Sequence, residues 1–206
     1  MVVYRTTKGV AHYFVKSENI RGVHRKSLRK AYESILKNTS REGLHLEFGV
    51  YKGKALEILA GMAEDVSFYG FDSFEGLPED FTDRLKTTAF TTSVPNLQSQ
   101  NTEIIAGKFE DTLVPFLKEH LKPVSFVHID CDVYSSTFYI LKTLHKYKRL
   151  IDGTVIVFDE FFVEEDGDWY NAEFCAFMDF ILKNAIDYEW LWYYKHNKFA
   201  LRVKDG

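Results

Sequence analysis

Short apolar runs alternate along most of the chain with longer segments that have one apolar face. The runs predict β-strands at residues 44–50, 66–72, 101–107, 124–130 and 153–161. The segments between them have the spacing of amphipathic helices, which predicts helices at residues 54–64, 112–121, 136–150 and 172–184. Because parallel strands are joined through crossover helices, this alternation predicts an α/β fold with a doubly wound, mostly parallel sheet.

The two ends of the chain depart from this alternation. Residues 188–204 predict two strands joined at His196 and Asn197, and without a helix between them one of the two must run antiparallel to the sheet. Residues 11–38 are expected to be mainly helical, with the basic stretch RGVHRKSLRK on the solvated face. We therefore expect a helical segment at residues 1–40, followed by one domain at residues 41–206.

Composition and charge narrow the classes of protein to consider. A chain of 206 residues with 46% hydrophobic residues can bury the core of one domain. The formal net charge of −4 gives no electrostatic footprint for nucleic acid. No apolar run is as long as a membrane span, and the first residues lack the features of a secretion signal. Two distant cysteines indicate neither a disulfide framework nor a zinc site. These features predict a cytoplasmic protein without nucleic-acid or membrane partners.

Carboxylates follow two of the predicted strands. Asp130 and Asp132 come directly after one apolar run and share a face of the extended chain, and Asp159 and Glu160 end the next run. Carboxylates that converge without a cation repel and raise one another's pKa values, whereas an all-oxygen cluster suits Mg²⁺ or Ca²⁺. The alternative is that these acids cap helices or pair with Lys and Arg. His128, inside the strand, is expected to be a core histidine with its hydrogen bonds satisfied.

Glycines and an acid follow the earlier strands. Gly49 and Gly53 flank a strand-to-helix turn where a ligand could approach the backbone, and Asp72 ends the next strand at the place where an acid can accept ribose hydroxyls. Gly107 and Phe109, after a third strand, could form a wall for adenine. The structural alternatives are an ordinary glycine turn and a helix-capping Asp. The spacing G-x-x-x-G is not the G-x-G-x-x-G of dinucleotide sites, which argues against an NAD-dependent dehydrogenase.

Taken together, these segments resemble the class I S-adenosylmethionine-dependent methyltransferases, and more narrowly the macrocin O-methyltransferase (TylF-like) family. The blocks LEFGVYKGKAL, FYGFDSFEGLPED, GKFEDTLVPFL, VHIDCDVYSST and GTVIVFDEFF match that family in order, over roughly residues 40–180. The resemblance implies a Rossmann-like, mostly parallel seven-stranded sheet that a terminal antiparallel strand closes.

The resemblance also implies roles for individual residues. The cofactor S-adenosylmethionine would contact residues after the first four strands: Glu47, Gly49 and Gly53 at the methionine part, Asp72 with Ser73 and Phe74 at the ribose, Gly107, Lys108 and Phe109 at the adenine, and Asp130. Mg²⁺ would be held by Asp130, Asp159 and Glu160. Asp132 would be the general base. The chain departs from the pattern at Glu160, where metal-dependent relatives commonly have Asp or Asn, and at Val133, where some have a His base.

The expected function is methylation of a hydroxyl on a sugar, glycoside or related small molecule, with Mg²⁺ assisting. A catechol-type phenol O-methyltransferase and a non-catalytic carbohydrate-binding or scaffold protein are the alternatives. Aromatic residues that would suit a sugar face or a phenyl ring are Phe161, Phe162, Trp169 and Tyr170. Residues 78–101 form a long loop without periodicity, expected to be a lid unless it is disordered. The oligomeric state stays open, with a homodimer as one option.

Overall fold

The computed structural model describes residues 2–7, 10–15, 23–24, 27–82, 84–161, 163–165, 168–170, 172–195 and 197–204. Its helices are α1 (Leu28–Lys37), α2 (Lys54–Met62), α3 (Phe109–Glu119), α4 (Tyr134–Lys146) and α5 (Ala172–Asn184). Its strands are β1 (Val2–Thr7), β2 (Val10–Val15), β3 (Val23–His24), β4 (Leu44–Phe48), β5 (Phe68–Asp72), β6 (Thr102–Ala106), β7 (Val124–Ile129), β8 (Val155–Phe158), β9 (Val163–Glu165), β10 (Asp168–Tyr170), β11 (Asp187–Tyr194) and β12 (Lys198–Lys204).

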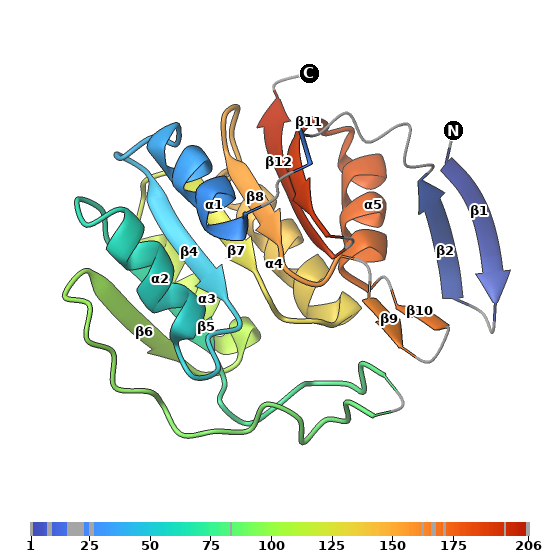
Figure 1. The fold of residues 1–206 in the computed structure, drawn as a ribbon, viewed down its shortest axis with the longest axis horizontal. Helices are drawn as coiled ribbons and strands as arrows, with labels where there is room; N and C mark the ends of the chain where they lie inside the picture. Colours follow the sequence, from blue (N-terminus) through green and yellow to red (C-terminus); the bar gives the residue numbers. More distant parts are fainter. Residues whose placement is uncertain are drawn as a thin grey trace.

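The central sheet has the order β3-β11-β12-β8-β7-β4-β5-β6 (Figure 1). Strands β4 to β8 pair in parallel, whereas β12 runs antiparallel to both β8 and β11. Apart from β3, a two-residue strand at the edge, this is a seven-stranded, mostly parallel sheet with one antiparallel strand near its end. The predicted fold class is therefore confirmed.

Helices cover both faces of the sheet and enclose two apolar cores. On one face, α1 and α2 pack against β4, β5 and neighbouring strands through side chains such as Leu36, Leu56 and Leu59. On the other face, α3, α4 and α5 bury residues such as Leu117, Leu144 and Phe177. All residues of β4, β7 and β8 are buried, as expected of central strands that have helices on both sides.

The chain reverses its direction of travel across the sheet between β4 and β7. From β4 it continues outward to β5 and β6, and it then returns to place β7 on the other side of β4. In open α/β sheets, the loops at such a point separate and leave a crevice beyond the carboxyl ends of the strands. The residues that follow β4, β5, β7 and β8 therefore lie where a ligand site is expected.

The amino-terminal part differs from its prediction. The helix expected at residues 11–38 begins only at Leu28, after Ser27, whose hydroxyl caps it by accepting the N–H of Lys30 at 3.4 Å. Ahead of it, β1 and β2 form an antiparallel pair beside α5 (Figure 1). Both strands are rich in Val, Tyr and Thr or Phe, which favour strands where a partner is present. The division into residues 1–40 and residues 41–206 stays a prediction.

The other predicted elements are present, with boundaries shifted by a few residues. Helix α3 starts at Phe109, three residues earlier than expected, and its first turn carries the acids Glu110 and Asp111, which suit a helix amino terminus. The β9–β10 hairpin was not predicted. No helix in the described part of the chain combines the length and the apolar character that crossing a membrane requires.

Candidate active site

A cleft of about 1120 Å³ opens at the carboxyl edge of the parallel strands. Residues from the ends of five strands line it, among them Gly49, Asp72, Lys108, Asp130, Asp132, Asp159 and Glu160. The loop after β5 adds a wall through residues that include Leu77, Thr87 and Phe90, and it runs along this edge in Figure 1. The volume exceeds what most single small ligands need, so the cleft has room for a cofactor and an acceptor together.

The turn after β4 needs glycine where it approaches β7. Gly49 has a φ of +93°, and a Cβ on it would lie 1.8 Å from the carbonyl oxygen of Asp130. The N–H of Asp130 in turn donates to the carbonyl of Phe48 at 2.8 Å. The glycine turn and the first acid after β7 are therefore in direct backbone contact.

Asp72 holds this same turn from the neighbouring strand. Its Oδ2 accepts the N–H groups of Val50 at 2.8 Å and Tyr51 at 2.7 Å, and its Oδ1 accepts the N–H of Phe74 at 2.8 Å. A carboxylate offers about four acceptor positions, so about one is left for a ligand. Asp72 thus lines the cleft, but most of its hydrogen-bonding capacity stabilises the loops around it.

The predicted cofactor residues separate into two groups in the structure. Those that line the cleft are Gly49, Asp72, Ser73, Lys108, Phe109 and Asp130. Glu47, Gly53, Phe74 and Gly107 are not among the described lining residues. Gly53 is the N-cap of α2, where a Cβ would lie 2.4 Å from the Leu97 side chain, and Glu47 is completely buried.

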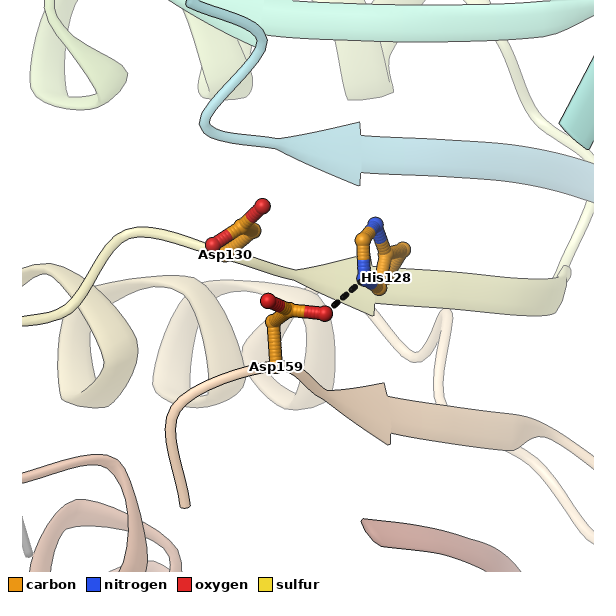
Figure 2. Close-up of side chains that lie close together, drawn as sticks. All are labelled: His128, Asp130 and Asp159. Carbon is orange, nitrogen blue, oxygen red and sulfur yellow. Dashed lines mark ion pairs between the residues drawn. The ribbon is translucent and has the colours of Figure 1, made fainter. Parts of the chain in front are cut away.

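The acids after β7 and β8 converge, although not in the predicted combination. Among the described residues, one group of three side chains brings potential metal-ligating atoms within 4.8 Å of one another: His128, Asp130 and Asp159. Figure 2 shows His128 at the end of β7, with the two aspartates following β7 and β8. Glu160 is not a member of this group, and its carboxylate accepts the Asn197 side chain at 3.4 and 3.5 Å.

His128 links the buried strands to this group. Its Nδ1 lies 2.8 Å from the Glu47 carboxylate, and its Nε2 lies 3.0 Å from the Tyr32 hydroxyl and 3.5 Å from Asp159. Burial lowers the pKa of His128, but hydrogen bonds to Asp159 and Glu47 outweigh it and raise the pKa to about 10. The expected core histidine is thus present with its nitrogens satisfied, and it also borders the cleft.

Lys198 supplies a second cation at this place. Its ammonium forms an ion pair with the carboxylate of Asp159, and both side chains are 17% exposed. Burial raises the pKa of Asp159, but His128 and Lys198 outweigh it and bring the pKa to about 2. Asp130 has a different environment: no described residue donates a hydrogen bond to its carboxylate, and burial followed by repulsion from Asp159 raises its pKa well above the usual range.

Asp132 lies in the cleft next to these groups and is only 8% exposed. Its backbone has a φ of +63°, a left-handed conformation that Asp tolerates better than most residues and that is common at functional sites. Burial, with repulsion from Glu160 and Asp159, raises the pKa of Asp132 to about 7. A carboxyl with such a pKa can exchange a proton near neutral pH.

The sequence interpretation missed several residues of the site. They are Tyr32, Lys198 and Glu173, whose carboxylate is completely buried and accepts the N–H of Glu160 at 3.2 Å. Lys198 could have been found from its position at the start of the predicted last strand. Glu173 and Tyr32 lie on helices. The hydrophobic pattern does not determine the rotation of a helix about its axis precisely enough to show which of its side chains reach the site.

The predicted acceptor aromatics are only partly described. Phe161 is completely buried in the core against Phe158, Phe174 and Phe199, so it does not line an acceptor pocket. This prediction is wrong because the chain turns inward directly after Glu160. Phe162 and the side chains of Trp169 and Tyr170 lie outside the described residues.

Comparison with known proteins identifies what kind of domain carries this site. A family model described as a methyltransferase domain matches residues 46–161, which is more than half of the chain. No curated protein sequence matches the chain.

Solved structures share the fold at low identity. A TDP-rhamnose 3'-O-methyltransferase of calicheamicin biosynthesis is 18% identical, with a TM-score of 0.62 and coverage of 86% of this chain and 79% of that chain. An O-methyltransferase from Bacillus cereus in complex with SAH is 16% identical, with a TM-score of 0.53 and coverage of 92% and 86%. An rRNA methylase from Streptococcus thermophilus is 14% identical, with a TM-score of 0.53 and coverage of 88% and 98%. Their acceptors differ, so this likeness concerns the fold.

Proposed function

The chain belongs to the family of methyltransferase domains, and from this premise we propose that it is a Mg²⁺-assisted O-methyltransferase that uses S-adenosylmethionine. The acceptor in this proposal is a hydroxyl of a sugar, glycoside or related small molecule, as the TylF-like motifs suggest. The observation that carries the proposal is the convergence of Asp130, Asp159 and Asp132 at one end of a large cleft, in backbone contact with the glycine turn.

The cofactor would occupy the part of the cleft beside the turn after β4. Gly49 leaves room for a close approach to the backbone there, and Asp72 offers a remaining acceptor position to a ribose hydroxyl. Lys108 and Phe109 border the opposite side, where Phe109 is held against Phe48 with ring centroids 5.4 Å apart. These residues fit a nucleoside that lies across the ends of β4, β5 and β6.

The donor set also fits a divalent cation. Asp130 is a half-buried carboxylate to which no described side chain donates, and Asp159 is the acid that raises its pKa most. Two neighbouring carboxylates of this kind destabilise the folded protein unless a cation or a proton neutralises their charge. We propose Asp130 and Asp159 as the protein ligands, and Glu160 as a third ligand only if its side chain leaves Asn197.

When bound, S-adenosylmethionine supplies the methyl group and Mg²⁺ lowers the pKa of the acceptor hydroxyl. Asp132 would accept the proton of that hydroxyl, which would leave the oxygen able to take the methyl group that the cofactor supplies. The loop wall and the strand ends hold the two partners in line, which is the main task of the protein in such a displacement. His128 orients the carboxylate of Asp159.

A methyl-transfer assay with radiolabelled S-adenosylmethionine tests the proposal. The acceptors are pooled sugars, glycosides and nucleotide sugars in one arm and catechols and other phenols in a second, each with Mg²⁺ and with EDTA. We expect transfer in the first arm that EDTA abolishes. Transfer that EDTA leaves unchanged would contradict Mg²⁺ assistance, and a protein that binds no S-adenosylhomocysteine in calorimetry would contradict the whole proposal.

A further inference from the structure

The antiparallel strand near the end of the sheet places Lys198 at the candidate metal site. Phe199 pairs with Phe158 in the register between β12 and β8, so Lys198 lies opposite Asp159. Because β12 runs in the reverse direction, its first residue reaches the edge at which β7 and β8 end. The position of Lys198 in the cleft therefore follows from the sheet, unlike that of a surface lysine on a free loop.

Lys198 contacts the carboxylate of Asp159, which is one of the groups that a metal ion would need as a ligand. Its Nζ pairs with Oδ2 of Asp159 and lies 3.4 Å from the Asp159 carbonyl oxygen. The other carboxylate oxygen, Oδ1, faces Nε2 of His128 at 3.5 Å. Asp159 thus has a cationic or donor group at each oxygen, whereas Asp130 has none among the described residues.

We propose that Lys198 is a built-in competitor for the metal: its ammonium takes the place of a divalent cation at Asp159, and a metal ion binds only when Lys198 moves away. The inference rests on the proposed function for the identity of the metal ligands, Asp130 and Asp159. It adds that the affinity of the site for metal is set by a residue that is not a ligand. Lys198 is therefore a positioning and tuning residue, not a catalytic one.

Displacement is feasible because other acids of the cleft can receive the ammonium. Glu160 and Asp132 both interact electrostatically with Lys198. The four-carbon side chain of lysine is flexible and its ammonium has no fixed donor plane, so it can exchange one carboxylate for another. A shift toward Glu160 would free Oδ2 of Asp159 for the metal and keep the charge of Lys198 inside the cleft.

The experiment measures Mn²⁺ binding to the purified full chain by electron paramagnetic resonance, without S-adenosylmethionine or an acceptor. The variants are Lys198→Met, which removes the ammonium, Lys198→Gln as a polar counterpart, and Lys198→Arg, which keeps the charge. Lys52→Met is the matched control, because Lys52 lines the same cleft but lies over the Tyr51 ring, away from Asp159. Circular dichroism and thermal unfolding establish that each variant is folded.

We expect Lys198→Met and Lys198→Gln to lower the dissociation constant of Mn²⁺ by about tenfold or more, since a neighbouring positive charge and a competing ion pair are both removed. Lys198→Arg should stay within about threefold of the wild type because it keeps the competing charge, and Lys52→Met should do so because the effect of its lost charge on the site is screened by salt. Equal affinity in the wild type and the two neutral variants would overturn the inference, and so would the absence of binding in every variant. Because no methyl acceptor is present, these results do not depend on whether the proposed reaction occurs.

Discussion

Among single residues, Asp132 has the environment that a general base needs. It lines the same cleft as Asp130, and its carboxyl is kept mostly from water. A base that acts near neutral pH needs such burial, because an exposed aspartate is too weakly basic to take a hydroxyl proton efficiently. The left-handed backbone at this residue turns the chain from β7 into α4 and directs the following helix away.

Replacement of Asp132 by Asn should lower kcat on the order of 10²- to 10⁴-fold, because the proton acceptor is lost while shape and size are kept. Affinity for S-adenosylhomocysteine should change little, since Asp132 is not among the residues proposed to hold the cofactor. Kinetics and calorimetry on the same preparation measure the two effects. Asp187→Asn, at the exposed start of β11, is the control. Full activity of Asp132→Asn would remove Asp132 from the mechanism.

A second residue, His45, should make stability depend on pH. It is completely buried, with ring centroids 5.3 Å from Phe68 and 6.2 Å from Phe126, and its Nδ1 lies 3.2 Å from the Gly43 carbonyl. Burial lowers the pKa of His45 to about 4. The unfolded chain, with an ordinary histidine pKa near 6.5, therefore binds the proton first as the pH falls. The stabilising effect of the neutral ring is complete above about pH 6.5 and is lost toward pH 4.

His45→Phe should remove this dependence and keep a ring between Phe68 and Phe126. The linkage amounts to about 2 kcal/mol at pH 5 for the wild type. Urea unfolding at pH 8 and pH 5 measures it: the difference between the two pH values should shrink by about that amount in His45→Phe. His145→Gln, on the exposed side of α4, should leave the difference as in the wild type. An unchanged pH dependence in His45→Phe would mean that His45 does not stay neutral in the folded protein.

The sequence predicted some single residues of the site and missed others, depending on their position relative to the strand ends. Residues directly after strand ends, such as Asp130 and Asp159, lie close together because the sheet topology brings them to one edge, and their predicted roles stay predictions. The partners of these acids were not predicted. Contacts such as those of Lys198 and His128 depend on strand register and side-chain direction, which a pattern of apolar residues does not specify.

At the scale of elements, hydrogen bonds connect the carboxyl-terminal end of the long loop after β5 to α2. Glu57 on α2 accepts the N–H groups of Gln98 and Ser99 and the Ser99 hydroxyl. At the other end of this helix, Asn101 donates toward the carbonyls of Ala60 and Val66 at 3.2 and 2.9 Å. These contacts anchor the loop close to β6, while its earlier part lines the cleft. The lid function predicted for residues 78–101 stays a prediction.

Glu57→Ala should loosen this anchor and expose the loop to protease. Arg84 and Lys86 lie in the loop, so trypsin can cut there when the segment opens. We expect faster cleavage at these sites than in the wild type. Gel electrophoresis and mass spectrometry measure the rate and identify the sites of cleavage. Glu64→Ala, an exposed acid just after α2, is the matched control. Cleavage at the wild-type rate would show that Glu57 does not restrain the loop.

The secondary-structure predictions were most accurate for the strands that are most deeply buried. The strands β4, β7 and β8 are covered on both faces and appear as continuous apolar runs. The pairs β1–β2 and β9–β10 depend on a neighbouring strand instead, and their local pattern does not distinguish a hairpin from a helix or loop. For this reason the central sheet was predicted, whereas the amino-terminal half of the helix expected at residues 11–38 was wrong.

For the molecule as a whole, a ligand that binds the folded state must raise the unfolding temperature. The cleft reaches across the ends of the central strands, so a nucleoside bound there would contact the most buried elements of the fold. S-adenosylhomocysteine at about 100 times its Kd should add about 2.7 kcal/mol. For a chain of 206 residues, this corresponds to a rise of roughly 5–10 °C.

Differential scanning fluorimetry measures this shift, and NAD at the same concentration serves as the comparison. We expect no shift with NAD, because the turn after β4 lacks the spacing of a dinucleotide site. A shift with NAD and none with S-adenosylhomocysteine would contradict the proposed cofactor. Calorimetric titration at one temperature provides an independent Kd against which the size of the shift can be checked.

The crowding between Gly49 and the Asp130 carbonyl has a consequence for how the two halves of the cleft communicate. A side chain at position 49 would collide with the Asp130 carbonyl, so the turn after β4 cannot take a larger residue unless the backbone after β7 shifts. If the proposed nucleoside and cation bind on the two sides of this contact, any coupling between their affinities would be equal in both directions. A larger residue at position 49 would be expected to disturb both affinities at once.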